Sequence, residues 1–188
     1  MPAPARTTTD AVVSAAPELI ERDGLDALTM QRVAAAVGVK GPSLYKRVDG
    51  REALVALVAE GVASALGEEM EEALAGAAHS DPAADLRVVA EAFRSFARRN
   101  PATYPLLFSP QHAAGSAEAR LRSVAPLRRV VARLAGAEHE LAAARMVTAW
   151  AIGFVSMELA GAFQLGGDVE EAWEFSLEGL ARALSGSR

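Results

Sequence analysis

The sequence predicts an all-α protein made of a small N-terminal domain and a larger C-terminal one, and three observations lead to this expectation. Of the 188 residues, 51% are hydrophobic, mostly Ala, Leu and Val, without the period-two alternation of strands. Apolar residues instead recur at helical spacing in several separate stretches. The chain also has no cysteine, so neither disulfides nor thiolate metal sites hold it together.

The first helix is expected to begin near Thr9 and to end at Gly24, which suits the left-handed position past a helix C-terminus. Pro17 predicts a kink or a helix that forms only after it. Residues 1–8 are expected to form a disordered arm. They lack the apolar core of a signal peptide, so we expect a cytoplasmic protein. The buried face at i, i+4, i+7 and i+8 consists of Val12, Ala16, Leu19 and Ile20.

Two short helices joined by a glycine turn are expected between residues 29 and 51. Thr29 can cap the first, whose buried face is Met30, Val33, Ala34 and Val37, and Gly38 ends it. The second begins at Pro42, whose missing N–H would have no partner there, and it buries Leu44 and Val48. A pair of this kind with basic residues outside is typical of a helix-turn-helix.

The positive charge of the chain gathers in this stretch, although the whole protein carries −5. Residues 38–51 have a net charge of +3, whereas the residues after them sum to −6. Both lysines of the protein, Lys40 and Lys46, lie in this stretch. Because association with DNA depends on the local field, the net acidity does not exclude a nucleic-acid partner.

The order Thr29, Gly38, Leu44-Tyr45, Asp49 and Arg51 closely resembles the N-terminal DNA-binding domain of the tetracycline-repressor (TetR) family of transcriptional regulators. The resemblance covers about Thr8 to Leu66. The family usually has Ser or Thr where Lys40 stands. A lysine cannot accept a backbone N–H, so Lys40 does not cap the second helix and is available to phosphate.

The resemblance implies a helix-turn-helix domain over residues 9–50 whose second helix enters the major groove of operator DNA. Residues 42–48 would span about 10 Å of helix, which fits a groove about 12 Å wide. At the start of this helix stands Pro42. Candidates for base edges or nearby phosphates are Lys40, Ser43 and Lys46. Candidates for phosphate positioning are Thr29, Tyr45, Arg47 and Arg51.

The regulatory domain is expected over residues 51–188, and a connector helix at about 50–76 joins it to the DNA-binding domain. Further helices are expected at Pro82–Asn100 and Ser116–Leu134, the latter with a kink or break at Pro126. Residues 101–110 form an apolar, proline-rich segment that we expect to be a short helical or irregular piece tucked into the core. Two last helices follow at about Glu138–Gln164 and Val169–Ser185, with Gly166-Gly167 as their turn. About nine helices result.

The twenty residues 146–165 carry Glu158 as their only charge, a length that would cross a membrane. Polar and small residues interrupt the run, so we interpret it as a helix buried on two sides. The resemblance implies that the last two helices form a four-helix homodimer interface. This segment is also similar to a TetR subgroup whose signature is Trp, then His-Gly, then an aromatic: Trp150, Gly153 and Phe154 match, whereas Ile152 stands at the His position.

No catalytic constellation is present, and no enzyme, cofactor or metal site is expected, because His79, His112 and His139 are scattered. An apolar pocket is the usual ligand site, and an aromatic stripe can equally be plain core. The candidate ligand contacts are Phe93, Phe96, Tyr104, Phe108, Trp150 and Phe154. We therefore expect a ligand-responsive regulator, a repressor released from a palindromic operator by a small hydrophobic effector. A small-molecule binding protein with a vestigial DNA-binding domain is the alternative.

Overall fold

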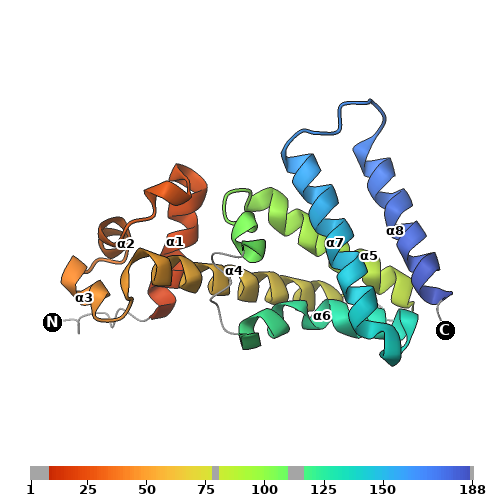
Figure 1. Ribbon diagram of the computed structural model, residues 1–188, viewed down its shortest axis with the longest axis horizontal. Coiled ribbons are helices and arrows are strands. Elements are labelled where there is room, and N and C mark those ends of the chain that lie inside the picture. Colours follow the sequence, from red (N-terminus) through yellow and green to blue (C-terminus); the bar gives the residue numbers. More distant parts are fainter. Residues whose placement is uncertain (1–8, 78–80, 110–116, 187–188) are drawn as a thin grey trace. The chain divides into compact units, whose positions relative to one another are not determined.

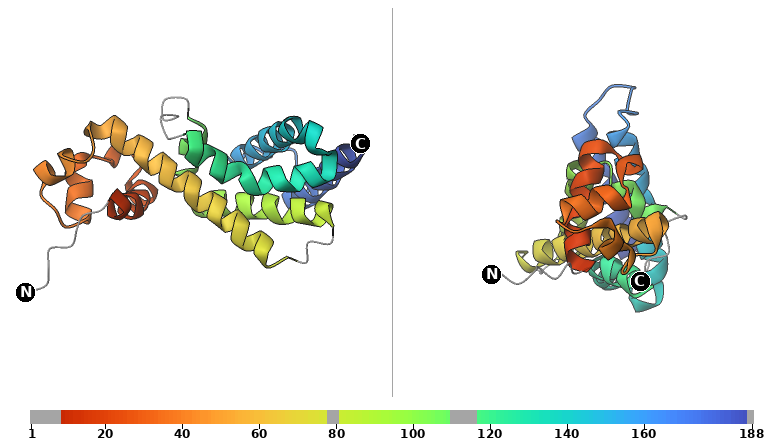
Figure 2. Two further views of the ribbon diagram at one scale, coloured as in Figure 1. Left: turned by 90° about the horizontal axis from the view of Figure 1, so that it is seen from below. Right: turned by 90° about the vertical axis from the view of Figure 1, so that its left-hand side faces the viewer.

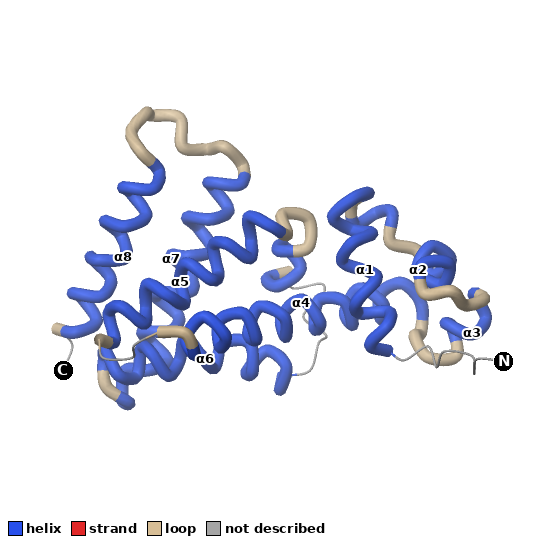
Figure 3. Tube along the Cα trace, turned by 180° about the vertical axis from the view of Figure 1, so that it is seen from behind, coloured by secondary structure: helices blue, strands red, loops and turns tan. Residues whose placement is uncertain are grey.

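The computed structural model describes residues 9–77, 81–109 and 117–186, and these residues form helices and loops without any strand (Figures 1 and 3). The predicted all-α fold is therefore confirmed. The predicted arm at residues 1–8, together with His79 and His112, lies outside the described residues. In chain order the elements are α1 (Thr9–Asp23), η1 (Leu25–Ala27), α2 (Met30–Ala36), α3 (Gly41–Tyr45), α4 (Gly50–Ala75), α5 (Pro82–Arg99), η2 (Tyr104–Phe108), α6 (Ala117–Ala135), η4 (Ala137–His139), α7 (Glu140–Leu159) and α8 (Val169–Ser185).

The chain divides into two compact units. Unit 1 comprises Met1–Ala65 and Asn100–Arg120, and unit 2 comprises Leu66–Arg99 and Leu121–Arg188. The long helix α4 contributes residues to both units. The division thus falls within a helix, and the segment containing η2 belongs to the N-terminal unit.

In unit 1, α1, α2 and α3 form a small bundle beside the first half of α4 (Figures 1 and 2). All four predicted core residues of α1 are at most 7% exposed. Helix α1 begins at Thr9 and continues through Pro17, so it does not form only after the proline. The Gly61 position on α4 lies so close to α1 that an added Cβ would stand 2.1 Å from Cγ1 of Val13. A larger residue at position 61 would therefore require the Val13 side chain to move.

The apolar segment after α5 is held in unit 1 by one carboxylate. Glu21 of α1 accepts hydrogen bonds from the backbone N–H groups of Ala102 (3.0 Å) and Thr103 (2.8 Å) and from the Thr103 hydroxyl (2.6 Å). Tyr104 and Leu106 are buried in the short 3₁₀ helix that follows. The prediction of a short helical segment tucked into the core is confirmed.

In unit 2, α5 buries all six residues that its periodicity predicted, which are Leu86, Val89, Ala90, Phe93, Phe96 and Ala97. Helix α6 is continuous through Pro126, so the helix does not break there, and the other predicted outcome, a kink, stays a prediction. Pro126, the next residue Leu127, and Ser123 three residues before the proline are all buried. Packing on both sides holds the helix together although the proline removes one backbone hydrogen bond.

Helix α7 ends at Leu159, five residues before the predicted end at Gln164. Gly161 adopts φ 61°, and the N–H of Ala162 donates to the Met157 carbonyl at 2.8 Å, which is the pattern of a Schellman motif. The predicted turn is confirmed, because Gly166 and Gly167 both have positive φ. The Asp168 carboxylate then caps α8 by accepting from the Glu170 N–H at 2.7 Å. Among the described helices, none is both long and apolar enough to cross a membrane.

Candidate DNA-binding and effector sites

Helices α2 and α3 pack together as a helix-turn-helix. The Thr29 hydroxyl caps α2 by accepting from the Arg32 N–H at 3.3 Å. Gly38, at φ 71°, ends α2, and the Val39 N–H donates to the Ala34 carbonyl at 2.8 Å. This second Schellman motif turns the chain toward α3. Leu44 of α3 and Val48, three residues after the end of the helix, are both buried, as their spacing predicted.

Helix α3 is shorter than predicted. It covers Gly41–Tyr45, five residues rather than the seven from 42 to 48, and so spans about 7.5 Å. Beyond it, the N–H groups of Arg47 and Val48 both donate to the Leu44 carbonyl, at 2.9 and 3.0 Å. The last turn is therefore tightened rather than extended, and Lys46 and Arg47 lie at the C-terminal end of the helix instead of within it.

Lys40 occupies the N-cap position of α3 in an extended conformation and forms no side-chain cap. Its carbonyl accepts from the Ser43 N–H at 2.9 Å, so the turn is closed by backbone alone. Pro42 lies in the first turn, where its missing N–H leaves one donor fewer to satisfy. The ammonium group of Lys40 is exposed and has no local structural task.

All eight residues predicted to contact DNA are exposed, and Arg51 also has a structural role. Thr29, Lys40, Pro42, Ser43, Tyr45, Lys46 and Arg47 all lie on the surface, and the Tyr45 side chain is 58% exposed. Arg51 is exposed as well, and it donates to the carbonyls of Leu28 (3.2 Å) and Leu25 (3.0 Å). Its guanidinium holds the α1–α2 connection in place, a role that its position in the sequence did not reveal.

The six aromatic candidates for ligand binding fall into two groups. Tyr104 and Phe108 form an edge-to-face pair in unit 1 with centroids 5.5 Å apart. In unit 2, Phe93 and Phe96 are buried on α5, and Trp150 and Phe154 belong to an aromatic cluster that also contains Phe163 and Trp173.

A buried arginine at the aromatic cluster was missed by sequence analysis. Arg94 is fully buried on α5. Its Nε and Nη2 donate to the two oxygens of Glu158 on α7, at 3.0 and 2.7 Å, and its Nη1 donates to Glu170 on α8 at 2.7 Å. Its guanidinium carbon lies 4.6 Å from the centroid of the Trp173 ring. Glu158, the one charge in an apolar stretch, was the signal that a buried partner exists.

The environment of Arg94 and Glu158 keeps both side chains ionised. Burial disfavours the charge of Arg94, but the hydrogen bonds that it donates to Glu158 and Glu170 outweigh this effect and raise the arginine pKa above its ordinary value. Burial would likewise raise the pKa of Glu158, but hydrogen bonds from Arg94 and Arg98 outweigh that effect, and the pKa of Glu158 lies below its ordinary value. Arg94 and Glu158 are therefore both charged around physiological pH.

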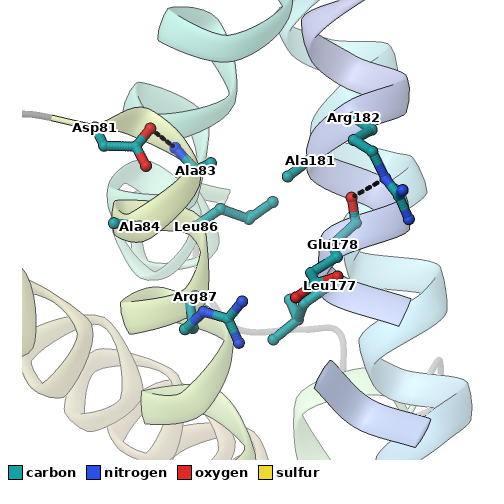
Figure 4. A pocket seen from close by; sticks show the side chains of 9 residues that line it. All are labelled: Asp81, Ala83, Ala84, Leu86, Arg87, Leu177, Glu178, Ala181 and Arg182. Atoms are coloured by element: carbon teal, nitrogen blue, oxygen red, sulfur yellow. Dashed lines mark hydrogen bonds between the residues drawn. The ribbon is translucent and has the colours of Figure 1, made fainter. Parts of the chain in front are cut away.

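Two hollows are present on unit 2, and none of the six aromatic candidates lines either. One, of about 370 Å³, lies between α5 and α8. In Figure 4, Leu86 and Arg87 extend from α5 toward Leu177 of α8. The other, of about 350 Å³, is lined by Glu71, Leu74, Ala75, Asp85, Arg129, Val130 and Arg133. Within the described ranges, no group of three or more His, Asp or Glu could hold a metal ion.

The fold and the exposed cations at the two ends of α3 define a class of protein: a helix-turn-helix DNA-binding domain followed by a helical C-terminal part. Comparison with known families agrees with this class. Residues 5–58 match the family described as bacterial regulatory proteins, tetR family. Residues 86–180 match the tetracyclin repressor-like C-terminal domain. The chain belongs to the TetR family of bacterial transcriptional regulators, which are DNA-binding and ligand-responsive.

Similar proteins include an uncharacterised HTH-type transcriptional regulator of Mycobacterium tuberculosis, 35% identical over 101 residues. That alignment covers 54% of this chain and 45% of the relative, so the chain spans less than half of its length. A protein of unknown function from Rhodococcus sp. RHA1 has a TM-score of 0.77 and 24% identity, covering 97% of this chain and 98% of that one. A TetR variant from Acinetobacter baumannii solved with minocycline has a TM-score of 0.69 and 23% identity, covering 95% and 96%. At these identities, the two structures support the fold alone.

Proposed function

We propose that this chain is a repressor that binds a palindromic operator through α3 and is released from it by a small effector. The observation that carries the proposal is the group of three exposed cations at the two ends of α3, Lys40, Lys46 and Arg47. No carboxylate among the described residues is paired with any of them. Unpaired cations on a helix-turn-helix are available to phosphates, and releasing counterions from DNA favours binding. We place the protein in the cytoplasm and assign it no enzymatic role.

In this proposal, Lys40, Ser43 and Lys46 contact base edges or nearby phosphates. The DNA is positioned through its phosphates by Thr29, Tyr45 and Arg47, because these residues lie at the ends of the two helices. The hydroxyl of Thr29 accepts a backbone N–H and keeps its own proton to donate to a phosphate. Arg51 stays a predicted phosphate contact, and its side chain is 44% exposed despite its two carbonyl bonds.

We further propose a homodimer through α7 and α8. Large apolar side chains point outward from both helices: Met146 is 40% exposed, Met157 46% and Phe175 71%. At Gly153, between the two methionines, an added Cβ would meet nothing within 4 Å, which leaves room for a close helix. Two copies related by a two-fold axis would read half-sites about one helical turn apart, or a multiple of it.

The effector is proposed to bind unit 2 and to act through α4, since this helix belongs to both units. A small hydrophobic effector fits the aromatic residues of this unit. The likeness to the Trp-His-Gly subgroup stays a prediction, because the matched C-terminal family is described only as tetracyclin repressor-like.

The test is fluorescence anisotropy of the purified protein with labelled DNA from upstream of its own gene, compared with scrambled DNA and repeated across salt concentrations. We expect saturable binding that prefers the native DNA to the scrambled DNA. The slope of the logarithm of the binding constant against the logarithm of the salt concentration, here called the salt slope, should fall in magnitude by about 0.9 for each phosphate contact removed. Lys46→Ala and Arg47→Ala should each reduce this slope. Arg129→Ala should not, because Arg129 is paired with Glu71 in unit 2. Weak binding that ignores sequence and both variants would support the alternative, a small-molecule binding protein with a vestigial DNA-binding domain.

A further inference from the structure

Two arginines and two glutamates of unit 2 form a closed ring of alternating charges. Arg94 contacts Glu158 at 2.7 Å, Glu158 contacts Arg98 at 2.5 Å, Arg98 approaches Glu170 at 3.6 Å, and Glu170 contacts Arg94 at 2.7 Å. The ring connects three helices, since Arg94 and Arg98 lie on α5, Glu158 on α7 and Glu170 on α8. In Figures 1 and 3 these helices run beside one another, with the α7–α8 loop at one end.

The members of the ring differ sharply in burial. The side chain of Arg94 is 0% exposed and that of Glu158 14%, whereas that of Glu170 is 55% exposed. Glu170 also stands in the first turn of α8, directly after an exposed loop with three glycines of positive φ. Its carboxylate could turn into water at little cost. Arg94 could not follow, because an unpaired buried cation is strongly destabilising.

The surroundings of Arg94 supply two further recognition elements. The rings of Trp173 and Phe154 lie beside its guanidinium, at 4.6 and 5.8 Å, and Trp150 stacks on Trp173 at 4.6 Å. The indole N–H of Trp173 is fully buried and has no hydrogen-bond partner. A buried donor without an acceptor costs free energy, so an acceptor brought by a ligand would be favoured here.

We propose that the effector is an amphipathic carboxylate that replaces Glu170 on Arg94. Its carboxylate binds Nη1 of Arg94, its apolar part packs against Trp173 and Phe154, and Glu170 turns outward into water. The charge of the ring is conserved, because one carboxylate leaves as another arrives. This inference rests on the proposed effector-responsive function and gives the hydrophobic effector an anionic end.

The exchange would also provide a response. Glu170 ties the start of α8 to α5 through Arg94, and the loss of this tie leaves α8 held at that end by its other contacts alone. Glu158 remains bonded to both arginines, so α5 and α7 stay connected. Effector binding would therefore loosen α8 selectively.

The two tryptophans of the chain, Trp150 and Trp173, both lie in this cluster, so intrinsic fluorescence reports on the site directly. We would titrate the full chain with decanoate and with decanol, which share a chain length and differ in charge. Glu170→Gln removes the competing carboxylate and should bind decanoate about tenfold more tightly than the natural chain. Glu171→Gln is the matched control, because it makes the same charge change on a neighbouring exposed residue of α8. It should leave the affinity unchanged.

A gain of affinity in one variant is not explained by misfolding. The proposal is overturned if Glu170→Gln shows no response to decanoate, if it binds decanoate no more tightly than Glu171→Gln, or if decanol binds as tightly as decanoate. The anisotropy assay separates this failure from failure of the proposed function. If specific DNA binding is present but the Glu170→Gln gain is absent, the inference alone fails. If the gain is present but decanoate does not release DNA, effector-driven release fails and the site stands.

Discussion

The cations at α3 and the arginines of unit 2 are used in opposite ways. At α3 of unit 1, Lys40, Lys46 and Arg47 are exposed and meet no described carboxylate. In unit 2, most of the described arginines are paired with Asp or Glu: Arg87, Arg94, Arg98, Arg99, Arg128, Arg129 and Arg133. A protein with a net charge of −5 can therefore belong to a DNA-binding family, because the acidic side chains of unit 2 neutralise cations of unit 2 and leave those of α3 free.

The residue types differ along the same division. Both lysines of the chain lie at α3, and the paired cations of unit 2 are all arginine. A guanidinium presents a planar set of donors that suits a carboxylate, as Arg94 does with both oxygens of Glu158. An ammonium group on a flexible stem is a compact point charge that can follow a phosphate.

The largest expected effect comes from breaking a buried pair. Arg94→Met should destabilise the protein by about 3 kcal/mol or more, because it leaves Glu158 and Glu170 without their buried partner. Arg99→Met is the control, since Arg99 is 54% exposed in its pair with Glu69, and an exposed pair contributes about 1 kcal/mol or less. Chemical denaturation of the two variants measures the difference. Equal losses would show that burial does not distinguish the pairs.

Acid should weaken unit 2 through the same ring. The pKa of Glu158 lies below its ordinary value in the folded protein, where hydrogen bonds from Arg94 and Arg98 outweigh burial. Its contribution to stability is present above the unfolded pKa, about 4.3, and is lost as pH falls through the lower folded pKa. The free energy of unfolding should therefore fall with pH below about 5. The pKa of Glu71 is also lowered, by its exposed pair with Arg129. High salt should screen this exposed pair and remove the contribution of Glu71 to the pH dependence of stability, while the contribution of Glu158 remains.

Arg51 combines features of the free cations at α3 and of the paired arginines of unit 2. It is basic and half-exposed, and its guanidinium is already hydrogen-bonded. Arg51→Ala should cost about 1 to 2 kcal/mol of stability through loss of its bonds to the carbonyls of Leu28 and Leu25. If the arginine also contacts phosphate, the same variant should reduce the salt slope of DNA binding by about 0.9. Thermal unfolding and anisotropy measured on one preparation separate the two roles. Loss of DNA affinity with unchanged stability would argue against the structural role.

The sequence predicted features that depend on local periodicity and turn chemistry. The cap at Thr29, the turn at Gly38 and the buried pair Leu44 and Val48 follow from neighbours a few residues away, and all three are confirmed. The ring around Arg94 depends on residues 64 and 76 positions apart. Helical spacing places Arg94 on a buried face but does not reveal its partner. Pro126 did not break α6 because tertiary packing outweighs a local preference.

The smallest expected effect concerns Lys40, and its measurement tests why an unpaired cation stands at the N-cap of α3. Lys40 provides no side-chain cap, and a cation at the positive end of a helix is unfavourable. When a residue violates a local folding preference such as helix capping and brings no structural gain, a functional reason for that residue is expected. Lys40→Ser should therefore raise stability by about 0.5 to 1 kcal/mol, because it removes this cation and its hydroxyl can share the N–H of Ser43 with the backbone carbonyl of residue 40.

The same substitution should weaken DNA binding, since it removes one of the free cations. Opposite signs for the two effects would place Lys40 among residues retained for binding at the expense of folding. Lys46→Ser is the control: Lys46 follows the end of α3 and has no N-cap to restore, so DNA affinity should fall without a gain in stability. If Lys40→Ser left DNA affinity intact while stabilising the chain, the free cation at this position would have no role in recognition. The contrast between the two units would then rest on Lys46 and Arg47 alone.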